Sequence, residues 1–252
     1  MRRVMLFTMM SLMGLTLLAV TFFSTQNIEQ NQKRIFDERA GRKIFLLGSR
    51  TEFSNSTEIT QQDVQLMWQK VQMGIQIVDQ FWQTKFTQNG IRYYRPQVKY
   101  FTSPVNTGCG TAEMNNAFYC GRDHTIYFDA LFFAKVMKGV GNSLGTDGDM
   151  AVIFILAHEW GHAAQAMTNR EFQFSINAEE NADCTAGAFT RYVYDNKWLE
   201  KGDLEEVTTA LNAFGDELPY GADGGHGDGL ERIAKFQRGL KGGLVACGGF
   251  TR

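Results

Sequence analysis

The first apolar stretch of the chain runs from Val4 to Phe23 and has no charge and no polar face. At 1.5 Å of rise per residue, a helix of about 20 residues crosses the roughly 30 Å of hydrocarbon in a bilayer. We therefore predict a membrane anchor over residues 1–25, in which residues 4–23 form a transmembrane helix in the lipid bilayer. A cleaved signal peptide is the alternative, although its apolar region is usually only about 7–15 residues long.

The charges that flank this stretch favour opposite orientations. Arg2 and Arg3 favour a cytoplasmic N-terminus, whereas the basic residues that follow favour the reverse when they are counted alone. Because the cysteines fall in plausible pairs, we predict a single-pass membrane protein whose body lies outside the cytoplasm, in the periplasm. Residues 26–58 are polar and mixed, and we expect a juxtamembrane linker there. The basic residues after the stretch are Lys33, Arg34, Arg39, Arg42 and Lys43.

The next pattern has apolar positions at spacings of three and four from Thr60 to about Thr87, which predicts a helix with one buried face. Thr60 and Asp63 fit the pattern of a helix start. The apolar positions are Val64, Met67, Trp68, Val71, Ile75, Val78 and Trp82.

A strand-like region follows this helix. Residues 97–102 alternate between apolar and polar, and residues 117–120 and 125–128 are short, aromatic and β-branched, so we predict a small antiparallel meander. Beyond it, residues 131–138 predict a helix, residues 139–148 form a Gly-rich loop, and Asp149 is expected to cap the next helix.

Residues 150–167 read MAVIFILAHEWGHAAQAM and predict a helix that is apolar all round before His158. His158 and His162 share one helix face, and their spacing lets both imidazoles bind one Zn²⁺. Glu159 lies one residue round the helix, within reach of water at the metal. This is the HExxH arrangement of zinc proteases, and it predicts one Zn²⁺ per chain. Two satisfied core histidines are the alternative, but a charged Glu in an apolar helix is costly without a partner.

A catalytic zinc needs a third protein ligand and an open fourth position. Glu179 and Asp183 share a helix face, whereas Glu180 points about 100° away. We predict Glu179 as the ligand and Asp183 as the acceptor that orients a ligating histidine. Glu180 or Asp183 as the ligand remains an alternative.

Glu179-x-x-x-Asp183 after HExxH resembles the thermolysin-type zinc proteases. More specific segments are GCG…FYC…D…IY.D…FF from Gly108 to Phe133, then LAHEWGHAAQ, then E-x-x-ADC-x-AG from Glu179 to Gly187, and finally His226-Gly227 followed by Arg232 and Phe236. Together these segments resemble the bacterial putative neutral zinc metallopeptidase family. The resemblance covers about residues 60–250. It implies an α+β, zincin-like fold over residues 59–252, mostly helical with a small antiparallel sheet beside the HExxH helix, behind an N-terminal membrane segment. Ala163 stands where the family often has His, and Gly121 where it often has Pro, but neither is a proposed ligand.

These observations predict a membrane-anchored zinc metallopeptidase, an endopeptidase that hydrolyses peptide bonds with zinc-activated water. Glu159 would act as the base. His226 is our candidate donor to the oxyanion, mostly on the strength of the resemblance. One alternative is a non-catalytic membrane-anchored binding or assembly protein that retains a zincin fold. Another is a zinc hydrolase that acts on an amide other than a protein.

The composition limits the partners. Hydrophobic residues make up 44% and charged residues 21%, a globular balance that excludes a disordered or fibrous chain. The net charge of −2 gives no electrostatic reason to expect nucleic acid, so we expect a peptide or protein substrate. Residues 125–128 would bind an extended peptide by edge addition, with Tyr127 lining the cleft, whereas His124 is expected to be structural.

Four cysteines allow two bridges. Cys109 with Cys120, and Cys184 with Cys247, would be sensible staples. Three connectivities are possible, and four buried thiols in a cytosolic enzyme are the alternative.

Overall fold

The computed structural model describes residues 58–216 and 225–250, which belong to the second of two compact units, residues 50–252. The predicted anchor and all but the last residue of the predicted linker lie outside the described residues. Among the helices that the structure describes, none combines the length and apolar character needed to cross a membrane. The elements are α3 (Gln61–Gln88), β1 (Gln97–Phe101), β2 (Val105–Thr107), β3 (Gly110–Ala112), β4 (Ala117–Cys120), β5 (Thr125–Asp129), α4 (Ala130–Leu144), α5 (Asp149–Met167), α6 (Ser175–Asp195), α7 (Asp203–Ala213) and α8 (Gly229–Cys247).

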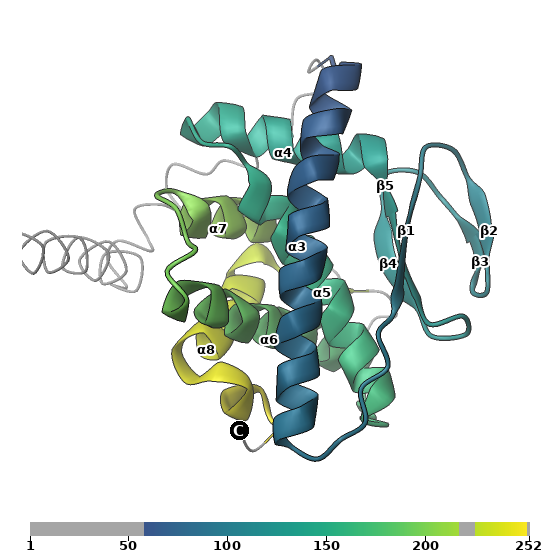
Figure 1. The fold of residues 1–252 in the computed structure, drawn as a ribbon, viewed down its shortest axis with the longest axis vertical. Coiled ribbons are helices and arrows are strands. Elements are labelled where there is room, and N and C mark those ends of the chain that lie inside the picture. Colours follow the sequence, from purple (N-terminus) through teal and green to yellow (C-terminus); the bar gives the residue numbers. More distant parts are fainter. Residues whose placement is uncertain (1–57, 217–224, 251–252) are drawn as a thin grey trace, which may run out of the picture. The chain divides into compact units, whose positions relative to one another are not determined.

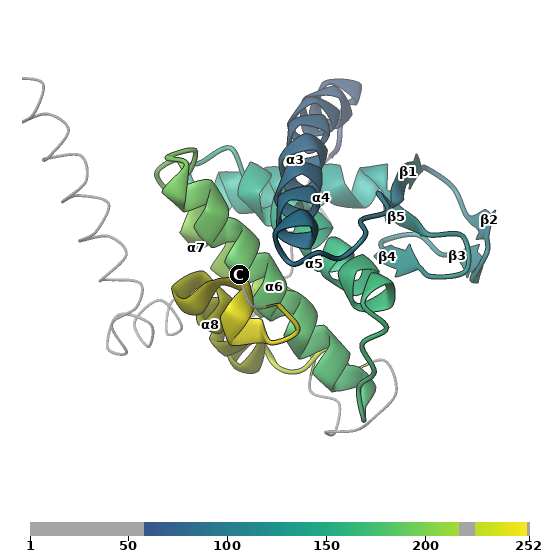
Figure 2. The same ribbon diagram turned by 60° about the horizontal axis from the view of Figure 1, so that its bottom comes forward.

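The fold of the described part is α+β and mostly helical, as predicted. Figure 1 shows the helices gathered on one side and the strands on the other, with α3 crossing in front of α5. The turned view in Figure 2 shows α5 between the sheet and α6, and α8 packed along α6. The helix that carries the HExxH motif therefore lies at the centre, with the sheet beside it.

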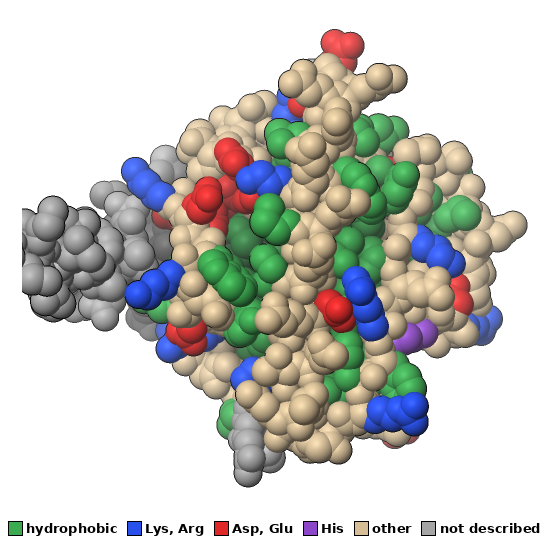
Figure 3. Space-filling model, in the orientation of Figure 1, with side chains coloured by type: hydrophobic (Ala, Val, Ile, Leu, Met, Phe, Trp, Pro, Cys, Tyr) green, Lys and Arg blue, Asp and Glu red, His purple; other side chains and the backbone are tan. Residues whose placement is uncertain are grey.

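Helix α3 begins where the sequence predicts. Thr60 and Asp63 form a capping box, in which each residue's side chain accepts from the other's backbone N–H. Its buried face includes Met67, Val71 and Trp82. Figure 3 shows hydrophobic side chains gathered on both sides of this helix. The spacing of the apolar residues therefore correctly predicted which face of α3 packs against the protein.

The three-stranded sheet corrects the predicted meander. Its order is β1-β5-β4, and β4 pairs with β5 in antiparallel fashion, but β1 pairs with β5 in parallel. The chain between β1 and β5 contains a separate β2-β3 hairpin, which the pattern of residues did not predict. This long connection returns the chain to the starting end of β1, so β5 runs in the same direction as β1.

The connection between α4 and α5 also differs from the prediction. Helix α4 continues through the expected loop to Leu144 and ends at Gly145, which has a φ of 69°. Val140 is fully buried and extends the apolar stripe of α4, so packing outweighs the low helix propensity of glycine here. The cap of α5 is Gly148 rather than Asp149, and Glu206 accepts the first backbone N–H groups instead.

Helices α6 and α8 approach each other very closely. A Cβ on Gly187 would collide with the carbonyl oxygen of Phe236, and one on Gly239 with that of Cys184. Both predicted cysteine pairs form disulfides, Cys109–Cys120 and Cys184–Cys247. The second bridge fixes the end of α8 to the middle of α6, directly after Asp183.

Candidate metal centre

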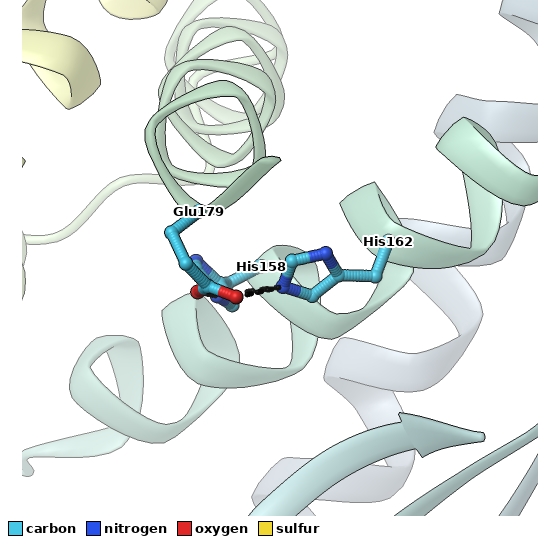
Figure 4. A group of neighbouring side chains, drawn as sticks. All are labelled: His158, His162 and Glu179. Atoms are coloured by element: carbon cyan, nitrogen blue, oxygen red, sulfur yellow. Dashed lines mark hydrogen bonds and ion pairs between the residues drawn. The ribbon is translucent and has the colours of Figure 1, made fainter. Parts of the chain in front are cut away.

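Three donor atoms converge between α5 and α6. His158 and His162 lie one turn apart on α5, and Glu179 approaches them from the first turns of α6 (Figure 4). His158 Nε2 lies 3.2 Å from His162 Nε2 and 3.0 Å from Glu179 Oε2, and His162 Nε2 lies 3.3 Å from Glu179 Oε1. Two imidazole nitrogens and one carboxylate thus face a common point, all within 4.8 Å of one another.

The chemistry of this donor set fits zinc. Two imidazole nitrogens and one carboxylate oxygen are the protein ligands of many catalytic zinc sites, which keep a further position open. The surroundings also favour positive charge. Burial lowers the pKa of His158, but the carboxylates of Asp183 and Glu179 outweigh burial and raise it to about 10. A divalent cation would supply the positive charge that these carboxylates stabilise.

Asp183 lies behind His158 rather than among the three donors. Its carboxylate is fully buried, and Oδ1 lies 2.8 Å from His158 Nδ1. Arg232 of α8 donates two hydrogen bonds of 2.9 Å to the same carboxylate. Burial raises the pKa of Asp183, but Arg232 and His158 outweigh burial, so its pKa lies below the ordinary value. An ionised Asp183 can only accept, so Nδ1 of His158 donates and Nε2 is left as the ligand atom.

Glu180, the alternative ligand, points elsewhere. Its carboxylate forms an ion pair of 2.9 Å with Lys235 of α8. Glu179 therefore lies among the three converging donors and Asp183 behind His158, whereas Glu180 is at neither place.

Glu159 lies between the donors and the sheet. Its side chain is buried, and Oε2 accepts a hydrogen bond of 2.8 Å from the backbone N–H of Tyr119 on β4. Burial raises the pKa of Glu159 above its ordinary value. A carboxylate with a raised pKa beside an open cleft is suited to taking up and returning a proton.

His226 reaches the rim of the site. Its side chain is half exposed, and Nε2 lies 3.9 Å from Glu179 Oε2. On the other side, Asp216 lies 3.2 Å from Nδ1 and accepts from the backbone N–H of His226 at 2.7 Å. The structure therefore brings this predicted residue to the donors, where its imidazole faces the cleft.

A cleft of about 670 Å³ opens beside the donors. Its walls come from β4, from the end of α5 and the chain after it, and from the start of α6. A smaller recess of about 180 Å³, lined by apolar and polar side chains alike, lies on the side of His158 and Glu159. The apolar side chains that line this recess are Phe132, Phe154, Ile155 and Phe214.

Two predictions about the cleft were wrong. Residues 125–128 have no free edge, because β5 has β1 on one side and β4 on the other. Tyr127 lies in a small buried cluster with Phe101 and Cys120, because alternate residues of a strand point to opposite faces. Strand β4 provides the edge at the cleft instead.

His124 lies beside the turn before β5. It lies 2.8 Å from both the Tyr119 hydroxyl and the Tyr94 carbonyl oxygen. Both ring nitrogens therefore have partners within the fold, in agreement with a structural role.

Comparison with known proteins identifies the family. A family model described as "Putative neutral zinc metallopeptidase" matches residues 48–250. The chain belongs to this family. The Uncharacterized protein YpfJ of Escherichia coli (strain K12) is 32% identical, with 68% of this chain and 67% of YpfJ covered. The Uncharacterized protein Rv2575 of Mycobacterium tuberculosis is also 32% identical, with 50% of this chain and 49% of Rv2575 covered. No solved structure gave a significant match.

Sequence reasoning missed two residues of the site. Arg232 entered only as part of the family resemblance, although it forms the buried ion pair with Asp183. Gln165 follows His162 by three residues, and its Oε1 lies 3.1 Å from His162 Nδ1. The spacing from His162 was visible in the sequence, because residues three apart share a helix face.

Proposed function

We propose that this member of the family is a zinc metallopeptidase that hydrolyses peptide bonds. The observation that carries the proposal is the convergence of His158, His162 and Glu179 beside a cleft, with the carboxylate of Glu159 next to them. When bound by these three side chains, Zn²⁺ supplies a Lewis acid that polarises a carbonyl group and makes water nucleophilic at neutral pH. One Zn²⁺ per chain is expected, because the three residues form one site.

The residues around the donors have separate tasks in this reaction. Glu159 takes the proton from the attacking water and returns it to the leaving amine. The Tyr119 N–H holds one oxygen of Glu159, so the carboxylate keeps a fixed orientation. His226, held through Nδ1 by Asp216, presents Nε2 as a donor to the oxyanion that develops on the carbonyl.

An extended peptide is the substrate class that the cleft favours. Strand β4 lines the cleft and has a partner strand on one side only. The Tyr119 N–H points away from β5 to Glu159, so by the alternation of a strand the backbone of Ala117 also faces the free edge. The Ala117 N–H already donates to Asn116 Oδ1, which leaves the Ala117 carbonyl oxygen to accept from an added strand. The recess beside Glu159, in which Phe132, Phe154 and Phe214 offer apolar contacts, would then receive a hydrophobic side chain next to the scissile bond.

The decisive experiment compares the full chain with its Glu159→Gln variant. The parent should contain about one zinc per chain by elemental analysis and should cleave an unfolded protein such as casein. Glu159→Gln should retain the zinc and lose cleavage, because the amide cannot take up a proton. Cleavage at the parental rate would show that Glu159 is not the base. Lack of zinc in the parent would overturn the proposal.

The chief competing function is that of a non-catalytic anchored binding protein, in which the zinc is only structural. A structural zinc has four protein ligands, whereas the described residues bring three together beside the cleft. A parent that contains zinc but cleaves no peptide, across a broad peptide library, would favour that competing function.

Membrane anchoring through residues 4–23, with the body in the periplasm, is part of the same proposal. Its support is the uncharged length of that stretch and the presence of two disulfides in the folded body. Protease added to spheroplasts should digest the body while the cells stay intact. Protection of the body until the cells are lysed would place it in the cytoplasm.

A further inference from the structure

A chain of side-chain amides runs from His162 to the end of α8. Gln165 Oε1 lies 3.1 Å from His162 Nδ1, and Gln165 Nε2 donates to Asn181 Oδ1 at 3.2 Å. Asn181 Nδ2 then donates to the carbonyl oxygen of Cys247 at 3.0 Å. Gln165 and Asn181 are both buried, with 8% of each exposed, so water does not compete strongly for these bonds.

The backbone fixes the direction of every bond in this chain. Gln165 Nε2 also donates to the carbonyl oxygen of Ala178 at 2.8 Å, and a carbonyl oxygen can only accept. The amino group of Gln165 must therefore face Ala178, which turns its oxygen toward His162. In the same way, the carbonyl of Cys247 turns the oxygen of Asn181 toward Gln165.

This direction determines which nitrogen of His162 carries the proton. The oxygen of Gln165 is an acceptor only, so His162 Nδ1 must donate to it. The neutral ring then has its lone pair on Nε2, the atom that faces His158 and Glu179. Gln165 thereby does for His162 what Asp183 does for His158, with an amide in place of a carboxylate.

The end of the chain of amides is itself held in place. Cys247 is joined to Cys184, and Arg170 donates to the carbonyl oxygens of Cys247 and Gly248 at 3.0 and 2.7 Å. Cys184 directly follows Asp183 in the sequence. The Cys184–Cys247 disulfide therefore joins the residue next to Asp183, which orients His158, to the residue whose carbonyl holds the amides that contact His162.

We propose that Gln165 is a positioning residue of the metal centre, which fixes the proton of His162 on Nδ1, and that Asn181 and the carbonyl of Cys247 fix Gln165 in turn. This inference rests on the proposed zinc function. It predicts that zinc affinity depends on two amides that do not touch the metal.

The test measures zinc affinity of the full chain by competition with a chelator, together with the absorption spectrum of the cobalt-substituted protein. Gln165→Met keeps the length of the side chain but removes its three hydrogen bonds, to His162, Ala178 and Asn181, and it should weaken zinc binding by about 10–100-fold. Gln165→Glu keeps an acceptor toward Nδ1 but sets an oxygen against Ala178. Gln165→Glu should therefore lower the free energy of unfolding in urea while retaining most of the zinc affinity.

Asn181→Leu should weaken zinc binding less than Gln165→Met, because Gln165 still has the carbonyl of Ala178. The double variant should bind zinc as Gln165→Met does, because Asn181 acts only through Gln165. Thr190→Val is the matched control. Thr190 is fully buried on α6 and donates only to Ala186, so its loss should reduce stability without changing zinc affinity or the cobalt spectrum.

Parental zinc affinity in Gln165→Met would overturn the inference, as would an equal loss in Thr190→Val. Additive losses in the double variant would overturn the part assigned to Asn181. If Gln165→Met does not fold, unchanged affinity in Asn181→Leu would overturn the inference on its own. A parent that binds no zinc would instead overturn the proposed function, so the two failures are distinguishable.

Discussion

Replacing Arg232 with methionine removes the positive charge that faces Asp183 but keeps a side chain of similar length. The carboxylate of Asp183 is fully buried and cannot turn to water. In Arg232→Met it would keep only the hydrogen bond from His158. We expect the variant to fold less stably, because it leaves a charge buried without its partner.

The size of the expected loss of stability follows from the hydrogen bonds and the ion pair that Arg232→Met removes. Arg232 donates two hydrogen bonds of 2.9 Å to Asp183 and one of 3.0 Å to the carbonyl of Phe214, and only 6% of the residue is exposed. Removing one partner of a buried ion pair typically costs about 3–5 kcal/mol. Arg232→Lys should cost less, because it keeps the charge and loses the paired geometry.

The assay is urea unfolding followed by tryptophan fluorescence, with a chelator present so that loss of metal does not contribute. Lys235→Met is the matched control, because Lys235 also joins α8 to α6, through Glu180 at 2.9 Å, but is a third exposed. It should cost less than about 1 kcal/mol. In the pair Asp183→Asn and Arg232→Met, the double variant should be more stable than the sum of the single losses implies.

Equal losses of stability in Arg232→Met and Lys235→Met would refute this reasoning. Additive losses in the double variant would also refute it, because the two side chains would then not stabilise each other.

Three further predictions concern other parts of the molecule. Burial and nearby Glu206 and Asp149 raise the pKa of Asp203 to about 7, so the native state binds a proton more tightly than the unfolded state and loses stability as the pH rises from about 4 to 7. At pH 8, Asp203→Asn should have a free energy of unfolding about 1–3 kcal/mol larger than that of the parent in urea unfolding. At pH 4 the two free energies of unfolding should be nearly equal. Gly239→Ala should cost more than about 1 kcal/mol in urea unfolding, because α6 and α8 must separate. Ile155→Phe should narrow the recess beside His158 and Glu159 and shift cleavage of a peptide library toward smaller side chains.

Local signals in the sequence predicted α3 and α5 well, whereas α7 and α8 were not predicted. The stripe and capping box of α3, and the apolar run of α5, depend on residues close together in the chain, so periodicity and cap chemistry suffice. The pairing of β1 with β5 depends on the path of the chain between them, which no local pattern fixes. The extension of α4 past Gly139 depends on what covers Val140, and that information also lies elsewhere in the chain.

In the candidate site too, the contacts set by helical spacing were predictable, and those between distant segments were not. The spacing of His158 and His162 and that of Glu179 and Asp183 are helical, so each pair was placed correctly on its helix face. Arg232 lies 49 residues from Asp183, and no periodicity connects them. Likewise, the free edge at the cleft belongs to β4 because β1 occupies the other side of β5, which only the assembled sheet reveals.

The burial of α5 determines how the protein should respond when a metal ion is removed from the candidate site. Fourteen of its nineteen residues are buried against the surrounding helices and the sheet. Small zinc modules unfold when stripped because the ion supplies much of their folding energy. In this chain the backbone of α5 is already enclosed by protein, so its amide hydrogens should exchange with deuterium almost as slowly in the stripped form. Uptake and release of the cation would then be reversible events on a protein that stays folded.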